Sequence, residues 1–286
     1  MKLILVFALF FLSFPSLYSQ EKVAFEIYKS DGSKSSYSEI LMIAEKSDIL
    51  LIGELHNNAL SHWLEYEITK DLYAIKNGMI TLGAEMFESD DQIVVDEYLS
   101  GKLSENNFKA EAKLWQNFKT DYKPLLDFAK TNNLKFIATN IPRRYSSMVY
   151  SRGLESLDSL EIEAYKWIVP LPFEIDMNLN CYKDIMEKAE GHGGENLPKS
   201  QAIKDATMAY FINRNIKERN IFIHFNGSYH SDYHESICWY LKKYDENYKI
   251  LTLTTIEQDD VKSLDKENLN KADFIIAVPA SFTKTY

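Results

Sequence analysis

Short apolar runs recur along the chain, and segments with helical periodicity separate them. Unbroken apolar runs of this length are typical of strands that are buried on both faces of a sheet. Strands that alternate with helices favour an α/β fold, in which helices flank a mostly parallel sheet. The predicted strands are VAFEIY at 23–28, ILLIG at 49–53, MITLGAEMF at 79–87, KFIATNI at 135–141, IFIHF at 221–225, and the runs 250–256 and 274–278.

The region from about residue 144 to residue 218 interrupts this alternation, because it contains no strand-like run. We predict that it forms a helical subdomain, inserted before the strand at 221–225 and laid over the sheet as a lid or a dimer surface. Residues 21–286 then form one domain. A helix is also expected from Tyr229 to Lys242, which would place His230 and His234 on one helix face.

The segment 1–20 has Lys2, an apolar run up to Phe14 and a polar exit after Pro15, which is the layout of a secretory signal peptide. The apolar run is shorter than the roughly 20 residues of a membrane span. No cysteine lies near the expected cleavage point, so we expect no lipid anchor. The sequence therefore predicts an exported protein, either periplasmic or secreted.

Composition and cysteine content exclude several classes of protein. The chain is 45% hydrophobic and 13% aromatic, which excludes disorder as its main state. Its net charge of −10 argues against general nucleic-acid binding. A CxxCH motif for covalent c-type haem does not occur. Export would permit a disulfide between Cys181 and Cys238, but we expect two separate buried thiols.

Polar or ionisable residues follow four of the predicted strands. Glu54 and His56 follow the first buried strand, Glu85 lies at the end of the second, Arg143 follows the third and His230 follows the fourth. Ligands of open α/β sheets bind beyond the carboxyl ends of the strands. We therefore expect these five side chains to converge on one pocket.

Two kinds of chemistry fit these residues. His56, Glu85 and His230 can ligate a divalent metal such as Mn, Co, Fe or Zn. The same side chains, with Glu54 as a further carboxylate and Arg143 as an anion clamp, can perform the acid–base work of a hydrolase. The structural alternative for Glu54 and Glu85 is that each caps the helix that follows it.

Two tyrosines lie close to the expected pocket. Tyr122 precedes Lys123 and Pro124, at a predicted helix start beside the sheet, and Tyr145 follows the arginine pair. The structural alternative for Tyr122 is that its ring packs on the sheet while its hydroxyl forms a hydrogen bond.

These motifs together resemble the ChaN-like haem-binding family of the Tiki/TraB/erythromycin-esterase superfamily. The resemblance covers nearly all of the chain after residue 20. The matching stretches, in family order, are ILLIGELHNNALSH, LGAEMFESDDQIVVDEYLSGKL, FKTDYKPLLDFAK, IATNIPRR, SQAIKDATMAYFI, FNGSYH and ADFIIAVP.

The resemblance implies an exported haem-binding protein of bacterial haem and iron acquisition. It implies that a tyrosine binds the haem iron, that two haems stack across a homodimer, and that an outer-membrane haem receptor is a partner. Tyr122 is our first candidate for the iron ligand and Tyr145 the second. The rival ligands are the imidazoles of His56 and His230.

The wider superfamily implies an alternative function. Its metal-dependent peptidase branches resemble this chain in two GxxH motifs, a glutamate and an arginine, and its esterase branch in the same His and Glu positions. The alternative is therefore a hydrolase, either metal-dependent or esterase-like. The chain departs from the usual second motif, because the bulky Tyr229 precedes His230 where a small residue is usual. The matching residues are Gly53, His56, Glu85, Arg143, Gly227 and His230.

Overall fold

The structure is a computed structural model that describes residues 22–189 and 192–286. The predicted signal peptide, residues 1–20, lies outside the described residues. Within the described ranges, no helix combines the length and the apolar character that a membrane crossing requires.

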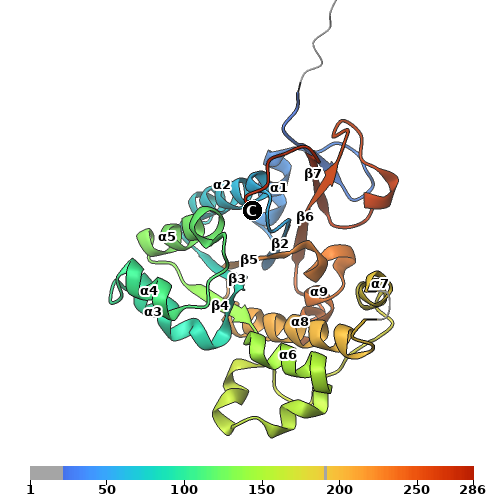
Figure 1. The fold of residues 1–286 in the computed structure, drawn as a ribbon. Coiled ribbons are helices and arrows are strands. Elements are labelled where there is room, and N and C mark those ends of the chain that lie inside the picture. Colours follow the sequence, from blue (N-terminus) through green and yellow to red (C-terminus); the bar gives the residue numbers. More distant parts are fainter. Residues whose placement is uncertain (1–21, 190–191) are drawn as a thin grey trace, which may run out of the picture.

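A seven-stranded sheet forms the centre of the molecule, with the order β1-β7-β6-β2-β5-β3-β4 (Figure 1). Every pair of neighbouring strands is parallel except β1 and β7, because the edge strand β1 runs antiparallel to β7. The mostly parallel α/β sheet that the sequence predicted is confirmed. The strands are β1 Glu26–Lys29, β2 Ile49–Glu54, β3 Ile80–Glu88, β4 Phe136–Asn140, β5 Ile221–Gly227, β6 Ile250–Gln258 and β7 Phe274–Pro279.

Helices cover both faces of the sheet, because alternate residues of each buried strand point to opposite faces. In β2, Leu50 and Ile52 pack against the helices of one face, whereas Ile49 and Leu51 pack against the helices of the other. The first face carries α1 Tyr37–Ala44, α2 Ala59–Ile75, α3 Gln92–Leu99, α4 Glu105–Glu111 and α5 Lys123–Thr131. The second face carries α6 Arg143–Arg152, α8 Asn196–Asn215 and α9 Ile237–Tyr244.

Short helical turns connect several of these elements. They are η1 Ser89–Asp91, the π-helical turn η2 Phe118–Tyr122, η3 Leu154–Ser159, η4 Ile162–Trp167, η5 Ser228–His230, η6 Asp232–His234 and η7 Lys266–Asn268.

The described parts of the region 144–218, which are 144–189 and 192–218, contain helices and no strand, as the sequence predicted, but the last helix belongs to the layer that covers the sheet. Ile203, Met208 and Ile212 of α8 are fully buried in the same core as Ile49 and Leu51 of β2. Helix α7 (Asn180–Lys188) instead belongs to a small separate apolar cluster with the start of α8. The region is thus partly sheet cover and partly an outer wall.

The helix expected from Tyr229 to Lys242 is wrong in its first half. Tyr233, His234 and Ser236 have φ angles of +60°, +56° and +52°, which are incompatible with a right-handed helix. The segment forms η5 and η6, and α9 begins only at Ile237. His230 and His234 therefore do not share a helix face: His230 is buried, whereas His234 is partly exposed beside Asp273.

The two cysteines are buried free thiols, as expected. Cys181 lies in the small cluster of α7 with Tyr182 and Ala202, and Cys238 lies in the core beneath α9. Burial raises the pKa of Cys181 to about 12, which keeps this thiol protonated and unreactive at neutral pH.

Candidate functional site

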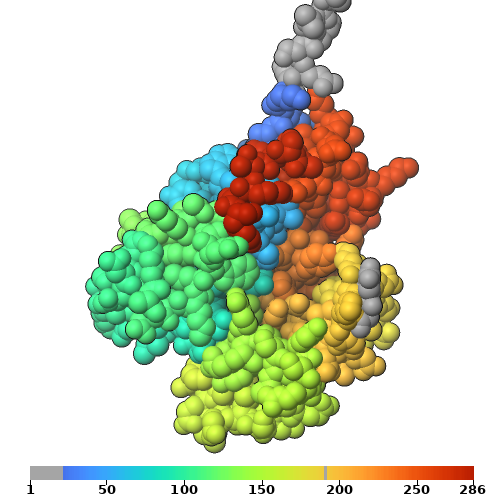
Figure 2. Space-filling view, viewed as in Figure 1, coloured from blue at the N-terminus to red at the C-terminus, as the bar shows by residue number. Residues whose placement is uncertain are grey.

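A cavity of about 930 Å³ lies at the carboxyl ends of the central strands. All five residues that the sequence placed at the strand ends contribute to its lining, namely Glu54, His56, Glu85, Arg143 and His230. Helices α6, α7 and α8 supply the opposite wall with Tyr150, Ile185, Lys188, Gln201 and Lys204. Figure 2 shows the hollow near the centre of this face, between α6 in lime green and the orange segment after β5.

Two strand-end glycines allow this close assembly. A Cβ atom at Gly53 would lie 3.0 Å from Cα of Ser228, and one at Gly227 would lie 2.7 Å from Cε1 of His56. Because neither residue has a side chain, the ends of β2 and β5 lie close together and the His56 ring rests against Gly227. Glu85 contacts the same glycine, because its Oε2 accepts a hydrogen bond of 2.8 Å from the Gly227 amide.

His230 is held between two buried carboxylates. Its Nδ1 lies 2.5 Å from Oδ1 of Asp205, and its Nε2 lies 3.2 Å from Oε1 of Glu85. Burial opposes the charged imidazolium, but the charges of Glu85 and Asp205 outweigh it and raise the pKa of His230 to about 10. Burial likewise opposes ionisation of Glu85, but the charge of His230 holds the pKa of Glu85 well below its usual range.

Glu54 connects the cavity to a second buried group of residues. Its Oε1 accepts a hydrogen bond of 2.7 Å from the Tyr122 hydroxyl and lies 2.8 Å from Nδ1 of His56. Burial, together with the nearby Glu65 carboxylate, raises the pKa of Glu54 to about 8. Burial opposes protonation of His56, but its hydrogen bond to Glu54 and the charge of Glu85 raise the pKa of His56 above its usual value.

Glu54 and Glu85 do not cap helices, so the structural alternative for these residues is wrong. Helix α2 is capped by Asn58, whose Oδ1 accepts hydrogen bonds from the amides of Leu60 and Ser61. Glu85 lies inside β3, and its Oε2 accepts from Gly227 instead.

The structure places neither predicted tyrosine on the cavity wall. Tyr122 is 2% exposed, and its hydroxyl is engaged by Glu54. Tyr145 packs against the core beneath α6, and its hydroxyl accepts a hydrogen bond from Arg144. Neither residue lines the cavity, so the structure does not support either one as a ligand to iron bound there.

Two other tyrosines line the cavity and are solvent-accessible. Tyr150 on α6 is 43% exposed and Tyr229 in η5 is 48% exposed. The Lys188 ammonium donates a hydrogen bond to the Tyr229 hydroxyl and lies 4.6 Å from the centre of its ring. The sequence contained the signal for Tyr229, because it is the bulky residue that departs from the family's second motif.

His56, Glu85 and His230 do not form a metal-ligand set. In the described part of the chain, these three do not bring ligand atoms together, and the group that does is Glu54, His62 and Glu65. Both ring nitrogens of His230 face carboxylates, so each donates a proton and neither has a free lone pair. With its pKa near 10, His230 is also protonated at neutral pH and is a poor general base.

Sequence reasoning missed Asp205, Lys188 and the pair His62 and Glu65. Asp205 and Lys188 lie in helices whose contact with the strand ends depends on tertiary packing, so no local pattern identifies them. His62 and Glu65 are three residues apart on α2, and that spacing is a usable signal for side chains on one helix face.

The model of a protein family described as "Haem-binding uptake, Tiki superfamily, ChaN" matches residues 40–241. The sequence has no match among curated proteins.

Solved structures share the fold. One is a structure of ChaN of Campylobacter jejuni, which is described as showing cofacial haem binding. It is 17% identical in sequence with a TM-score of 0.65, and the match covers 90% of this chain and 97% of that chain. A mutant of the erythromycin esterase EreC in its open conformation is 10% identical with a TM-score of 0.51, over 90% of this chain and 98% of that chain. A succinoglycan biosynthesis protein is also 10% identical with a TM-score of 0.51, over 90% of this chain and 94% of that chain.

Proposed function

Because the chain belongs to the haem-binding uptake family of the Tiki superfamily that includes ChaN, we propose that it binds haem in the cavity at the strand ends. The observation that carries the proposal is the position of Tyr229. Its ring lies on the cavity wall with an accessible hydroxyl beside the Lys188 ammonium. A tyrosine oxygen on a cavity wall is a ligand type that haem proteins use for iron.

The other lining residues suit the rest of a haem molecule. Leu55, Trp115 and Ile141 provide apolar surface for a flat macrocycle. Arg143, an exposed arginine on the same wall, offers charge-assisted hydrogen bonds to a propionate carboxylate. Lys204 on α8 offers a second cationic partner.

Tyr229 fits this role better than the imidazoles of the cavity. His230 has both nitrogens engaged by carboxylates, whereas His56 has only its Nδ1 engaged by Glu54. His56 is therefore the remaining rival for the iron. Bound haem would supply an iron centre, and an oxygen ligand such as Tyr229 would favour its ferric state.

We further propose that the protein is exported through residues 1–20 and serves haem or iron acquisition, with a homodimer and an outer-membrane haem receptor as assemblies. Support comes from the charge and apolar layout of residues 1–20 and from the described cofacial haem binding of ChaN of Campylobacter jejuni. N-terminal sequencing of protein recovered from outside the cytoplasm tests export. Light scattering with and without haemin tests the dimer.

Titration of the purified protein with ferric haemin tests the central proposal. We expect saturable binding with a shifted Soret band. We expect Tyr229→Phe to alter the visible spectrum of the complex and to weaken binding by about tenfold or more, because a ligand to the iron would be lost. Tyr150→Phe removes the other accessible hydroxyl of the wall. Tyr122→Phe is the matched control, because its hydroxyl lies outside the cavity and should leave the spectrum unchanged.

Two results would contradict this assignment. If Tyr229→Phe keeps the wild-type spectrum while His56→Ala changes it, the iron ligand is His56. If the wild-type protein does not take up haemin in a saturable way, the chain does not bind haem in this cavity.

A further inference from the structure

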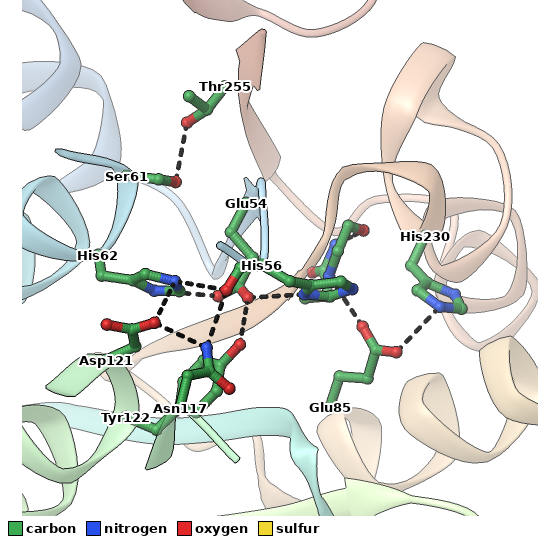
Figure 3. Close-up of polar contacts among 12 residues, drawn as sticks. Glu54, His56, Ser61, His62, Glu85, Asn117, Asp121, Tyr122, His230 and Thr255 are labelled. Atoms are coloured by element: carbon green, nitrogen blue, oxygen red, sulfur yellow. Dashed lines mark hydrogen bonds and ion pairs between the residues drawn. The ribbon is translucent and has the colours of Figure 1, made fainter. Parts of the chain in front are cut away.

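A second polar group lies behind the cavity, where the end of β2 meets α2. It consists of Glu54, His62 and Glu65, which are 1%, 5% and 0% exposed. Figure 3 shows Glu54 and His62 side by side in this group. Tyr122 and His56 contact only Oε1 of Glu54. Within the described residues, Oε2 of Glu54 and Oε1 of Glu65 are buried without any hydrogen-bond partner. Leaving such oxygens unpartnered in the interior is costly.

The hydrogen bonds of His62 fix which of its nitrogens carries the proton. Nε2 of His62 lies 3.1 Å from the backbone carbonyl oxygen of His56, which can only accept. Nε2 therefore carries a proton, and Nδ1 is the ring nitrogen that a cation can reach. A metal-ligating histidine typically donates its other N–H to a carbonyl or carboxylate in this way.

The other ring nitrogen of His62, Nδ1, faces two carboxylate oxygens. Nδ1 lies 3.0 Å from Oε2 of Glu65 and 3.6 Å from Oε2 of Glu54. Three electron-rich atoms at these separations need either shared protons or a cation among them. Ligand atoms about 2.1 Å from a tetrahedral ion are about 3.4 Å apart, which is close to both separations.

The charges around the group also favour a cation. Glu54, Glu65 and the neighbouring Asp121 are three buried carboxyl groups, and Asp121 lies 3.5 Å from Nε2 of His62. In residues 22–189 and 192–286, histidines are the basic side chains that reach these carboxyls, and no Lys or Arg forms an ion pair with them.

We propose that Glu54, His62 and Glu65 hold one divalent metal ion of the zinc class in a buried site behind the haem cavity, with Glu54 shared between the two. One imidazole and two carboxylates form a ligand set that suits Zn²⁺ and the other first-row divalent ions. The ion would join the end of β2 to α2 and would leave Oε1 of Glu54 free for Tyr122 and His56. The site does not depend on haem binding.

Zinc binding by the untagged, chelator-treated full chain tests the proposal. We expect about one Zn²⁺ per chain by calorimetry and elemental analysis, and a rise in the melting temperature when Zn²⁺ is added. Glu65→Gln and His62→Gln should each weaken zinc binding by at least about 100-fold, as expected for loss of a ligand. Glu65→Gln keeps the size and polarity of the buried side chain, so it should fold without metal yet show no rise in melting temperature with zinc.

Two sets of control variants distinguish this site from the surface of α2 and from the haem cavity. Glu67→Gln changes a partly exposed carboxylate of the same helix, and should bind zinc as the wild type does. His230→Gln and Glu85→Gln change the haem cavity, and should also keep zinc binding. If the folded wild type binds no zinc, a shared proton fills the group and the proposal is wrong. If zinc binding survives Glu65→Gln but is lost in His230→Gln, the metal belongs to the cavity and the proposal is likewise wrong.

Discussion

Glu54 and Glu85 are buried carboxyl groups near the ends of two strands of one sheet, β2 and β3. Their surroundings nevertheless shift their pKa values in opposite directions. Burial raises the pKa of Glu54 to about 8, whereas the imidazolium of His230 holds the pKa of Glu85 well below its usual range. The sequence placed both residues at strand ends. It could not assign their charges, because these depend on Asp205 and Glu65, which lie in helices on opposite faces of the sheet.

Adjacent arginines at the start of α6 should have different effects when they are removed. Arg143 lines the cavity, whereas Arg144 pairs with Asp90 and stacks 4.4 Å from the centre of the Tyr145 ring. We expect Arg143→Ala to weaken haemin binding by roughly tenfold, since a charge-assisted contact is lost, without changing stability. Arg144→Ala should lower the free energy of unfolding by about 0.5–1 kcal/mol with little effect on haemin. Haemin titration and urea unfolding of both variants make the comparison, and equal effects on haemin affinity would contradict the assignment.

His224 should make the protein less stable in mild acid. It is fully buried between Thr139 and Asn226, and burial lowers its pKa from 6.5 to about 4. Above pH 6.5 the residue is neutral in both states and contributes no pH dependence. As the pH falls from 6.5 to 4, His224 binds a proton in the unfolded chain but stays neutral in the folded chain. The free energy of unfolding therefore falls by up to about 3 kcal/mol.

The variant His224→Gln isolates this effect from that of the carboxyl groups. Its free energy of unfolding should fall less steeply than that of the wild type between pH 6.5 and pH 4, when both are measured by urea unfolding. Parallel curves for the two proteins over that range would show that His224 is protonated in the folded state.

At the scale of elements, the sequence predicted the sheet well and the β5–α9 connection poorly. A continuous apolar run such as 49–53 is typical of a strand in a sheet that helices cover on both faces, because alternate side chains then all become buried. The segment 229–236 has a composition that permits a helix. Its backbone instead enters the left-handed region at Tyr233, His234 and Ser236, none of which is a glycine. That conformation carries His230 toward Asp205, and only the packed structure reveals it.

Asn58 should contribute more to the free energy of unfolding than an ordinary helix cap does. Its Oδ1 caps α2 by accepting from two amides, and its Nδ2 donates to Glu257 at 3.1 Å, all in a fully buried position. We expect Asn58→Ala to lower the free energy of unfolding by about 2–3 kcal/mol, because it removes the cap and leaves buried polar groups unpaired. Ser104→Ala, at the exposed cap of α4, should cost about 0.5–1 kcal/mol. Urea unfolding measures both, and equal losses would show that the burial of Asn58 adds nothing to its cap.

At the scale of the whole molecule, the site is assembled from both layers of the fold. The strands supply one side of the cavity, and α6, α7 and α8 supply the other. The cavity rim could be predicted from sequence because parallel strands end at the same edge of a sheet. The opposite wall could not, because the exposure of Tyr150 and Lys188 to the cavity depends on how the helices after β4 pack over that edge.

The outer wall of the cavity should become less mobile when haem binds. Helix α7 is held by a small cluster centred on Tyr182, so local opening of this helix should cost less than global unfolding. If the form with α7 opened does not bind haem, haemin at 100 times its dissociation constant should lower the population of that form by about 100-fold. Trypsin cleavage after Lys188 should therefore slow strongly in the presence of haemin. Cleavage after the exposed Lys262, which follows β6 and does not line the cavity, should keep its rate and serves as the internal control. Equal cleavage rates after Lys188 with and without haemin would show that α7 does not close over the ligand.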